Sequence, residues 1–141
     1  MSKQILLLSA VGHDDLFDRM VKEVEQRCGV LIIQALYQIR GSHKRLDDKF
    51  LSWARQKMED SHLTILLVND HFFASSPLSL LGQEAVLSQK ALCIVVSGTK
   101  MLPVWFPRDQ AMFASPATPL DPRIFDISSK YLKGQPGPFF S

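Results

Sequence analysis

Residues Leu63–Val68 (LTILLV) form a continuous apolar run that limits the folds open to this chain. Such a run suits a strand covered on both faces, as in the middle of a parallel sheet. The stretch just before it carries apolar residues at the spacing of one helix face: Leu46, Phe50, Leu51, Ala54 and Met58. A helix, a short link and a buried strand form half of a βαβ unit, so this stretch predicts an α/β fold.

The rest of the chain repeats this alternation of strands and helices. Further strands are expected at 4–10, 30–39 and 91–96, with a short edge strand at 110–113. Helices are expected at 14–27, 47–60, 78–90 (interrupted by Gly82) and 122–132. These elements predict a flavodoxin-like three-layer fold, in which a mostly parallel sheet of four to five strands carries helices on both faces.

Length and composition are those of one ordinary globular domain. The 141 residues are 46% hydrophobic and 21% charged, which predicts a single domain over residues 1–133. The segment 134–141 (GQPGPFFS) is expected to be a flexible tail. The formal net charge of +2 does not indicate a nucleic-acid or membrane-surface partner. The two cysteines, Cys28 and Cys93, lie far apart without a CxxC pattern, which favours reduced, packed thiols in a cytoplasmic protein.

Several common catalytic motifs are absent from the sequence. The first strand is followed by SAVGHDD rather than by the G-x-G-x-x-G of a dinucleotide-binding fold, and the chain has neither a P-loop nor a GxSxG elbow. The four histidines are not spaced as zinc ligands, and no metal site is predicted: His13, His43, His62 and His71. A phospho-receiver domain would use Asp14, Asp15 and Asp70 for Mg²⁺, but no lysine-proline pair ends a fifth strand.

Polar residues follow the expected strands, and sites in doubly wound folds gather beyond the carboxyl ends of the strands. One of these segments is basic and holds Arg40, Gly41, Ser42, His43, Lys44 and Arg45, with Lys49 behind it. Two aromatic pairs lie near the same region. We expect Phe72–Phe73 to plug a strand end within a loop at 72–77, and Trp53, beside the apolar stripe of its helix, to pack in the core.

Three stretches together resemble the superfamily of Toll/interleukin-1 receptor (TIR) domains and the related SEFIR domains. LLLSAVGHDDLFDRMVKEVEQ is similar to the opening strand and helix of that family. IRGSHKRLDDKFLSWARQKMEDSHLTILLVND resembles its loop, tryptophan-bearing helix and buried strand. FFASSPLSLLGQEAVLSQKALCIVV resembles the next helix and strand, with Glu84 at the family's glutamate position. The resemblance covers residues 4–132, and Leu80-Leu81 replaces the expected tryptophan-cysteine pair, which moves the match towards SEFIR-like or divergent members.

The resemblance implies a cytosolic signalling module, in a receptor tail or adaptor, that assembles with like domains through homotypic contacts. It would need no cofactor, nucleic acid or membrane insertion. The basic segment 40–45 and Lys49 would form the interface, facing acidic residues of another copy such as Asp14, Asp15, Glu23 or Glu59.

The alternative implied by the resemblance is an NAD⁺ glycohydrolase that is activated by oligomerisation. In NAD-cleaving TIR domains the glutamate on this helix stabilises the ribosyl cation as nicotinamide leaves, a role in which Glu84 would meet developing positive charge. Ser9, Gly12 and Trp53 are its candidate companions. A flavodoxin-like binding module without catalysis is a third hypothesis.

Overall fold

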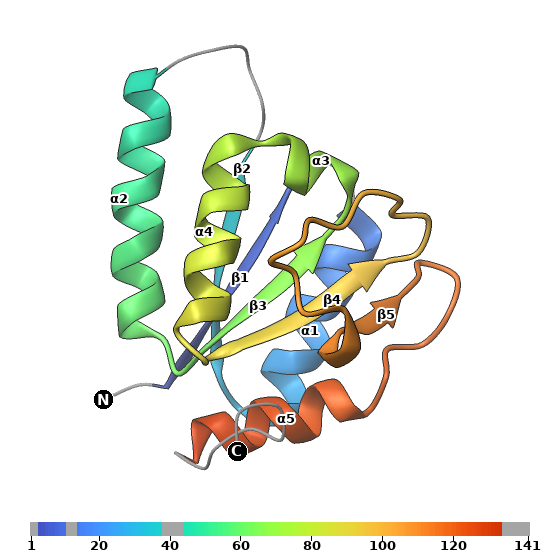
Figure 1. The fold of residues 1–141 in the computed structure, drawn as a ribbon. Coiled ribbons are helices and arrows are strands. Elements are labelled where there is room, and N and C mark those ends of the chain that lie inside the picture. The colour runs from blue at the N-terminus through green and yellow to red at the C-terminus, as the bar shows by residue number, and fades with distance from the viewer. Residues whose placement is uncertain (1–2, 11–13, 38–43, 134–141) are drawn as a thin grey trace.

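The structure, a computed structural model, describes residues 3–10, 14–37 and 44–133, with the backbone alone at 14, 36–37 and 44–47. Strands and helices alternate along the chain (Figure 1). In order they are β1 (Gln4–Ala10), α1 (Asp14–Cys28), β2 (Leu31–Tyr37), α2 (Lys44–Asp60), β3 (Leu63–Val68), α3 (Asp70–Ala74), α4 (Ser76–Leu87), β4 (Ala91–Val96), the 3-10 turn η1 (Arg108–Gln110), β5 (Met112–Ala114) and α5 (Arg123–Leu132).

The five strands form one sheet in the order β2-β1-β3-β4-β5, and every neighbouring pair is parallel. In its centre Ile5 pairs with Leu63, and Thr64 pairs with Ala91. Each parallel pair requires a crossover, and the helices supply it. The predicted α/β, flavodoxin-like sheet with helices on both faces is therefore confirmed, and all of its strands are parallel.

Alternate residues of the central strands feed two separate cores. In β1, Ile5 and Leu7 pack with α1 and α5, whereas Leu6 and Leu8 pack on the opposite face with α2 and α4. This follows from the period of two in a strand, and it makes β1, β3 and β4 apolar throughout. In Figure 1, α1 lies behind the sheet while α2 and α4 stand in front of it.

The face with α1 and α5 follows its predicted pattern closely. The predicted core side of α1 is buried in full: Leu16, Phe17, Met20, Val21 and Val24. Ile124, Ile127, Ser128 and Tyr131 are likewise buried along α5. Gly29 adopts φ +62° after α1, a left-handed conformation that glycine reaches without strain, so its predicted capping role is confirmed.

The segment after β3 differs from its prediction as a loop. Residues Asp70–Ala74 form the short helix α3, and Asn69 caps it because its side chain accepts a hydrogen bond from the Phe72 N–H at 2.8 Å. Phe72 is fully buried, which agrees with its predicted role as a plug. Burial of this ring and the cap together favour a helical turn where five residues show no periodicity.

Helix α4 is continuous at Gly82, where an interruption was predicted. A Cβ atom at Gly82 would lie 3.1 Å from ring atoms of both Phe72 and Trp105. The glycine therefore allows close approach of two aromatic rings, and this packing compensates for its low helix propensity. The helix also ends at Leu87, three residues earlier than predicted.

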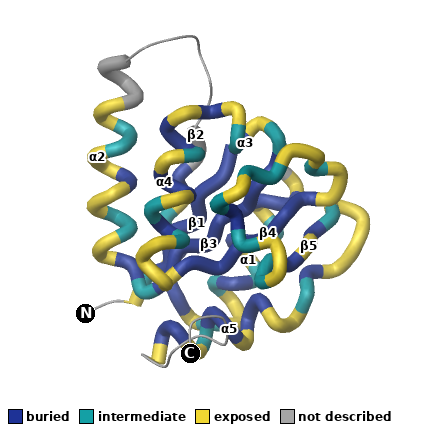
Figure 2. Tube along the Cα trace, viewed as in Figure 1, coloured by how far each residue is buried: buried dark blue, intermediate teal, exposed yellow. Residues whose placement is uncertain are grey.

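Helix α2 begins at Lys44, three residues before its predicted start, and it is the most exposed described helix in Figure 2. Among its residues with described side chains, Ala54 alone is buried. Trp53 is 40% exposed, so its predicted place in the core is wrong. It lies next to the apolar stripe of α2 but beyond the part that reaches the sheet.

Candidate functional site

The carboxyl edge of the sheet is the usual place for a site in this fold, and here hydrogen bonds within the protein occupy it. The Ser9 hydroxyl is buried and donates to the Leu67 carbonyl at 3.0 Å. The Asp70 carboxylate accepts the backbone N–H groups of Lys100 and Met101, both at 3.0 Å. Ser9, a candidate companion of Glu84, is thus used for pairing strands.

The hydrogen bonds from Met101 and Lys100 lower the pKa of Asp70 below its ordinary value. Its charge therefore fixes the start of the loop after β4. A hollow of about 190 Å³ remains beside it, lined by Asn69, Asp70, His71 and residues 96–99. This volume is below the roughly 300–1,000 Å³ of small-molecule sites, so the edge offers little room for a nucleotide.

Glu84 lies on α4 and faces Arg55 on α2. The guanidinium donates from Nε to both carboxylate oxygens, at 3.0 and 3.2 Å, and from Nη2 at 3.0 Å. The carboxylate raises the pKa of Arg55 through these hydrogen bonds and its charge. Both side chains are more than a third exposed, so the pair is a fork-like clamp between two helices at the surface.

A groove of about 480 Å³ runs beside this ion pair. Its lining comes from α2 and from the end of α4: Ser52, Arg55, Gln56, Met58, Glu59, Glu84, Ser88 and Lys90. Lys90 directly precedes β4, so the groove lies at the amino end of that strand, opposite the edge that holds Ser9 and Asp70. The structure thus gives Glu84 a groove, but it separates Glu84 from the carboxyl edge.

The outward side of α4 carries exposed leucines. Leu80 is 42% exposed and Leu87 is 75% exposed, and their spacing of seven residues places them on the same side of a helix. Leu87, named as a possible core residue of this helix, therefore faces solvent. Buried residues Leu78, Leu81 and Ala85 take the sheet side, so α4 is apolar on two opposite sides.

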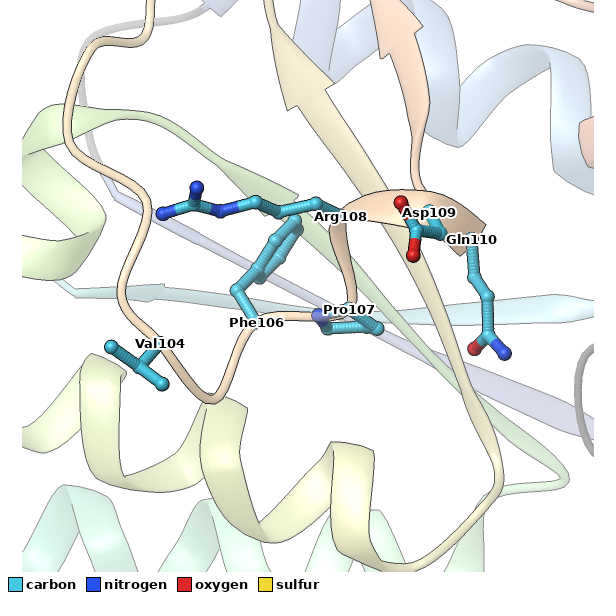
Figure 3. Close-up of a pocket in the computed structure, with 6 residues that line it drawn as sticks. All are labelled: Val104, Phe106, Pro107, Arg108, Asp109 and Gln110. Carbon is cyan, nitrogen blue, oxygen red and sulfur yellow. The ribbon is translucent and has the colours of Figure 1, made fainter.

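A second hollow, of about 460 Å³, lies in the long connection between β4 and β5 (Figure 3). It is lined by Val104 and residues 106–110. Arg108 reaches back across the connection and donates from Nη2 to the Leu102 carbonyl at 2.6 Å. Beneath it, the rings of Phe73, Trp105 and Phe106 meet edge to face. The connection is therefore irregular, as predicted, but braced.

The predicted basic interface falls mostly outside the described residues. Arg40, Gly41, Ser42 and His43 lie there, as does Gly12, a candidate companion of Glu84. Lys44 and Arg45 are in the first turn of α2, where the backbone alone is described. Lys49 is exposed on the same helix. These residues remain interface predictions.

The thiols and the acidic or imidazole groups show no catalytic cluster within the described ranges. Cys28 and Cys93 are both free, and burial raises the pKa of Cys93 to about 12, which keeps it an unreactive thiol. Over residues 3–10, 14–37 and 44–133 there is no group of three His, Cys, Asp or Glu side chains placed to hold a metal ion.

Comparison with known proteins leaves the fold as the main guide to function. No protein-family model matches the chain, and no curated protein matches it significantly. None of the helices in the described part of the chain combines the length and apolar character needed to cross a bilayer.

Proposed function

We propose that this protein is a cytosolic signalling module that assembles with like domains through homotypic contacts of the TIR/SEFIR type. The observation that carries the proposal is the outward side of α4, where Leu80 and Leu87 are exposed on a helix whose opposite side is already buried in the core. Exposed apolar side chains gathered on one helix face are typical of protein-protein contacts.

The carboxyl edge supports the same proposal from the opposite direction. Its polar groups are engaged by Ser9 and Asp70, and the hollow left there is small. A domain without a roomy pocket at this edge is better suited to surface recognition than to small-molecule chemistry. No cofactor enters this proposal, and its partners are further copies of this domain or related ones.

Self-association measured over a concentration series tests the proposal. Leu87→Glu places a charge on the α4 surface, and Val104→Glu makes a matched change at a fully exposed valine on the β4–β5 connection. Sedimentation velocity should show weak association of the wild type and of Val104→Glu, with the Leu87→Glu protein shifted to monomer. Equal behaviour of the two variants, or a wild type that stays monomeric at millimolar concentration, would overturn the proposal.

A second candidate, NAD⁺ glycohydrolase activity at Glu84, is favoured by the groove of about 480 Å³ beside that residue. This volume lies within the roughly 300–1,000 Å³ typical of ligand sites. In this mechanism the carboxylate would stabilise the ribosyl cation as the bond to nicotinamide breaks. Arg55 would have to release it first, because a carboxylate paired with a guanidinium offers less negative charge to that cation.

Nicotinamide release from NAD⁺ by concentrated protein tests this second candidate. Activity that disappears in Glu84→Gln, and that rises or persists in Arg55→Gln, is the expected signature of catalysis. No release by a folded, self-associating wild type would exclude it and leave the assembly proposal in place.

A further inference from the structure

The connection between β5 and α5 displays two Ser/Thr-Pro pairs within six residues. Its sequence 115–120 is SPATPL, with Ser115 before Pro116 and Thr118 before Pro119. The chain has a third such pair, Ser76-Pro77. Because Ser/Thr-Pro is the acceptor pattern of proline-directed kinases, the three pairs provide a comparison within one molecule.

The base of this connection is held in place while its tip is displayed. Arg19 of α1 donates from Nη2 to the Ser115 carbonyl at 2.9 Å, and the Thr118 N–H donates to the same carbonyl at 3.3 Å. Leu120 is buried at the far end. Residues 116–119 between these anchors are all exposed. The tip is thus a fixed projection from the sheet edge.

We propose that Thr118 is a phosphorylation site for a proline-directed protein kinase. The Thr118 Oγ attacks the γ-phosphorus of ATP, the bond to the β-phosphate oxygen breaks, and ADP leaves while a kinase carboxylate takes the hydroxyl proton. The kinase must surround both the hydroxyl and the proline that follows it. At Thr118-Pro119 both residues are exposed, so this pair meets the requirement in the folded protein.

The other two pairs meet the requirement less well. Ser115 is half-buried, and its hydroxyl oxygen accepts the Ala117 N–H at 3.2 Å. Ser76 is exposed, but it is the first residue of α4 and Pro77 behind it is buried. A kinase would have to unwind the start of α4 to reach Pro77, and such local opening has a free-energy cost.

Phosphorylation at Thr118 would change the electrostatics of the whole domain. A phosphothreonine carries about −1.5 to −2 charges at neutral pH, which nearly cancels the formal net charge of +2. The modification would therefore act on charge-dependent assembly as well as on the local surface.

Incubation of the folded protein with a purified proline-directed kinase and Mg-ATP, followed by site mapping by mass spectrometry, tests the proposal. A peptide digest of the same chain, treated in parallel, presents all three pairs without their fold. In the folded protein Thr118 should take up phosphate at least about tenfold faster than Ser76, because only Ser76 needs local opening. In the digest this difference should largely disappear.

Two variants complete the experiment. Thr118→Ala should remove the main phosphate from the folded protein, and Pro119→Ala should reduce it strongly while leaving the hydroxyl in place. Failure to modify Thr118 in the folded chain, equal modification of Ser76, or indifference to Pro119→Ala would each overturn the proposal.

Discussion

The two faces of the sheet differ in how completely their helices are buried. Helix α5 places six of its ten residues in the core, and Ser128 among them is fully buried. On the opposite face, Ala54 is the one buried residue among the side chains described in α2, and α4 leaves Leu80 and Leu87 exposed. The first face is built for stability, whereas the second keeps apolar surface available to a partner.

The contacts between helices show the same contrast. Helices α2 and α4 are joined at the surface by the Arg55–Glu84 pair. On the other face, Arg27 of α1 lies over the ring of Phe125 of α5, 4.3 Å from its centroid, and that ring is itself buried. An exposed ion pair contributes little to stability, so α2 is the helix whose position a partner could change at the lowest cost.

Truncating the α5 core should give the largest effect. Ile124 is fully buried, and Ile124→Ala should lower the free energy of unfolding by about 2–5 kcal/mol. Leu87→Ala, a truncation on the exposed side of α4, should change it by less than about 0.5 kcal/mol. Chemical denaturation of both variants measures the difference, and comparable losses would show that the outward side of α4 is part of the fold.

Gly82→Ala tests the close packing on the second face. The added methyl group would lie 3.1 Å from ring atoms of Phe72 and Trp105, and Phe72 is fully buried with little freedom to move. Overpacking should outweigh the gain in helix propensity and lower stability by about 1 kcal/mol. A stabilised variant in thermal unfolding would instead show that the two rings can move away.

The main strands could be predicted from the sequence because central parallel strands are apolar on both faces. Leu63–Val68 and Ala91–Val96 have the predicted bounds. The helix α3 could not, since a five-residue helix shows no period and its start depends on one capping contact of Asn69. Trp53 was misplaced because a periodic stripe does not indicate how much of its width reaches the sheet.

The site was less predictable than the fold for a topological reason. Arg55 and Glu84 are 29 residues apart, and their pairing depends on the strand order, which brings α2 and α4 together on one face. A single sequence gives the elements but does not order the strands. A glutamate on an expected helix was identified, but the arginine that binds it carried no signal.

The charge of Asp70 should make stability depend on acid. Its pKa is lowered in the folded protein by the Met101 and Lys100 N–H groups, so its contribution is complete above the ordinary value of 3.8. That contribution is lost as the pH falls through the lower folded pKa. The stability gap between wild type and Asp70→Asn should therefore shrink from about pH 6 to about pH 2 in denaturant titrations. A constant gap would show that the charge is not involved.

The Arg55–Glu84 pair should give the smallest effect on stability, because both groups are largely hydrated. A double-mutant cycle with Arg55→Gln and Glu84→Gln, measured by denaturation at low and high salt, should show weak coupling that salt reduces further. Strong, salt-independent coupling would mean that the pair is needed to hold α2 against the sheet.

The most direct test of the central claim is to record amide NMR spectra of the protein at increasing concentration. If α4 is the assembly surface, the concentration-dependent shifts should gather at Leu80, Gln83 and Leu87 and leave α1 and α5 unchanged. Shifts that gather on α5, or spectra that do not change with concentration, would contradict the account.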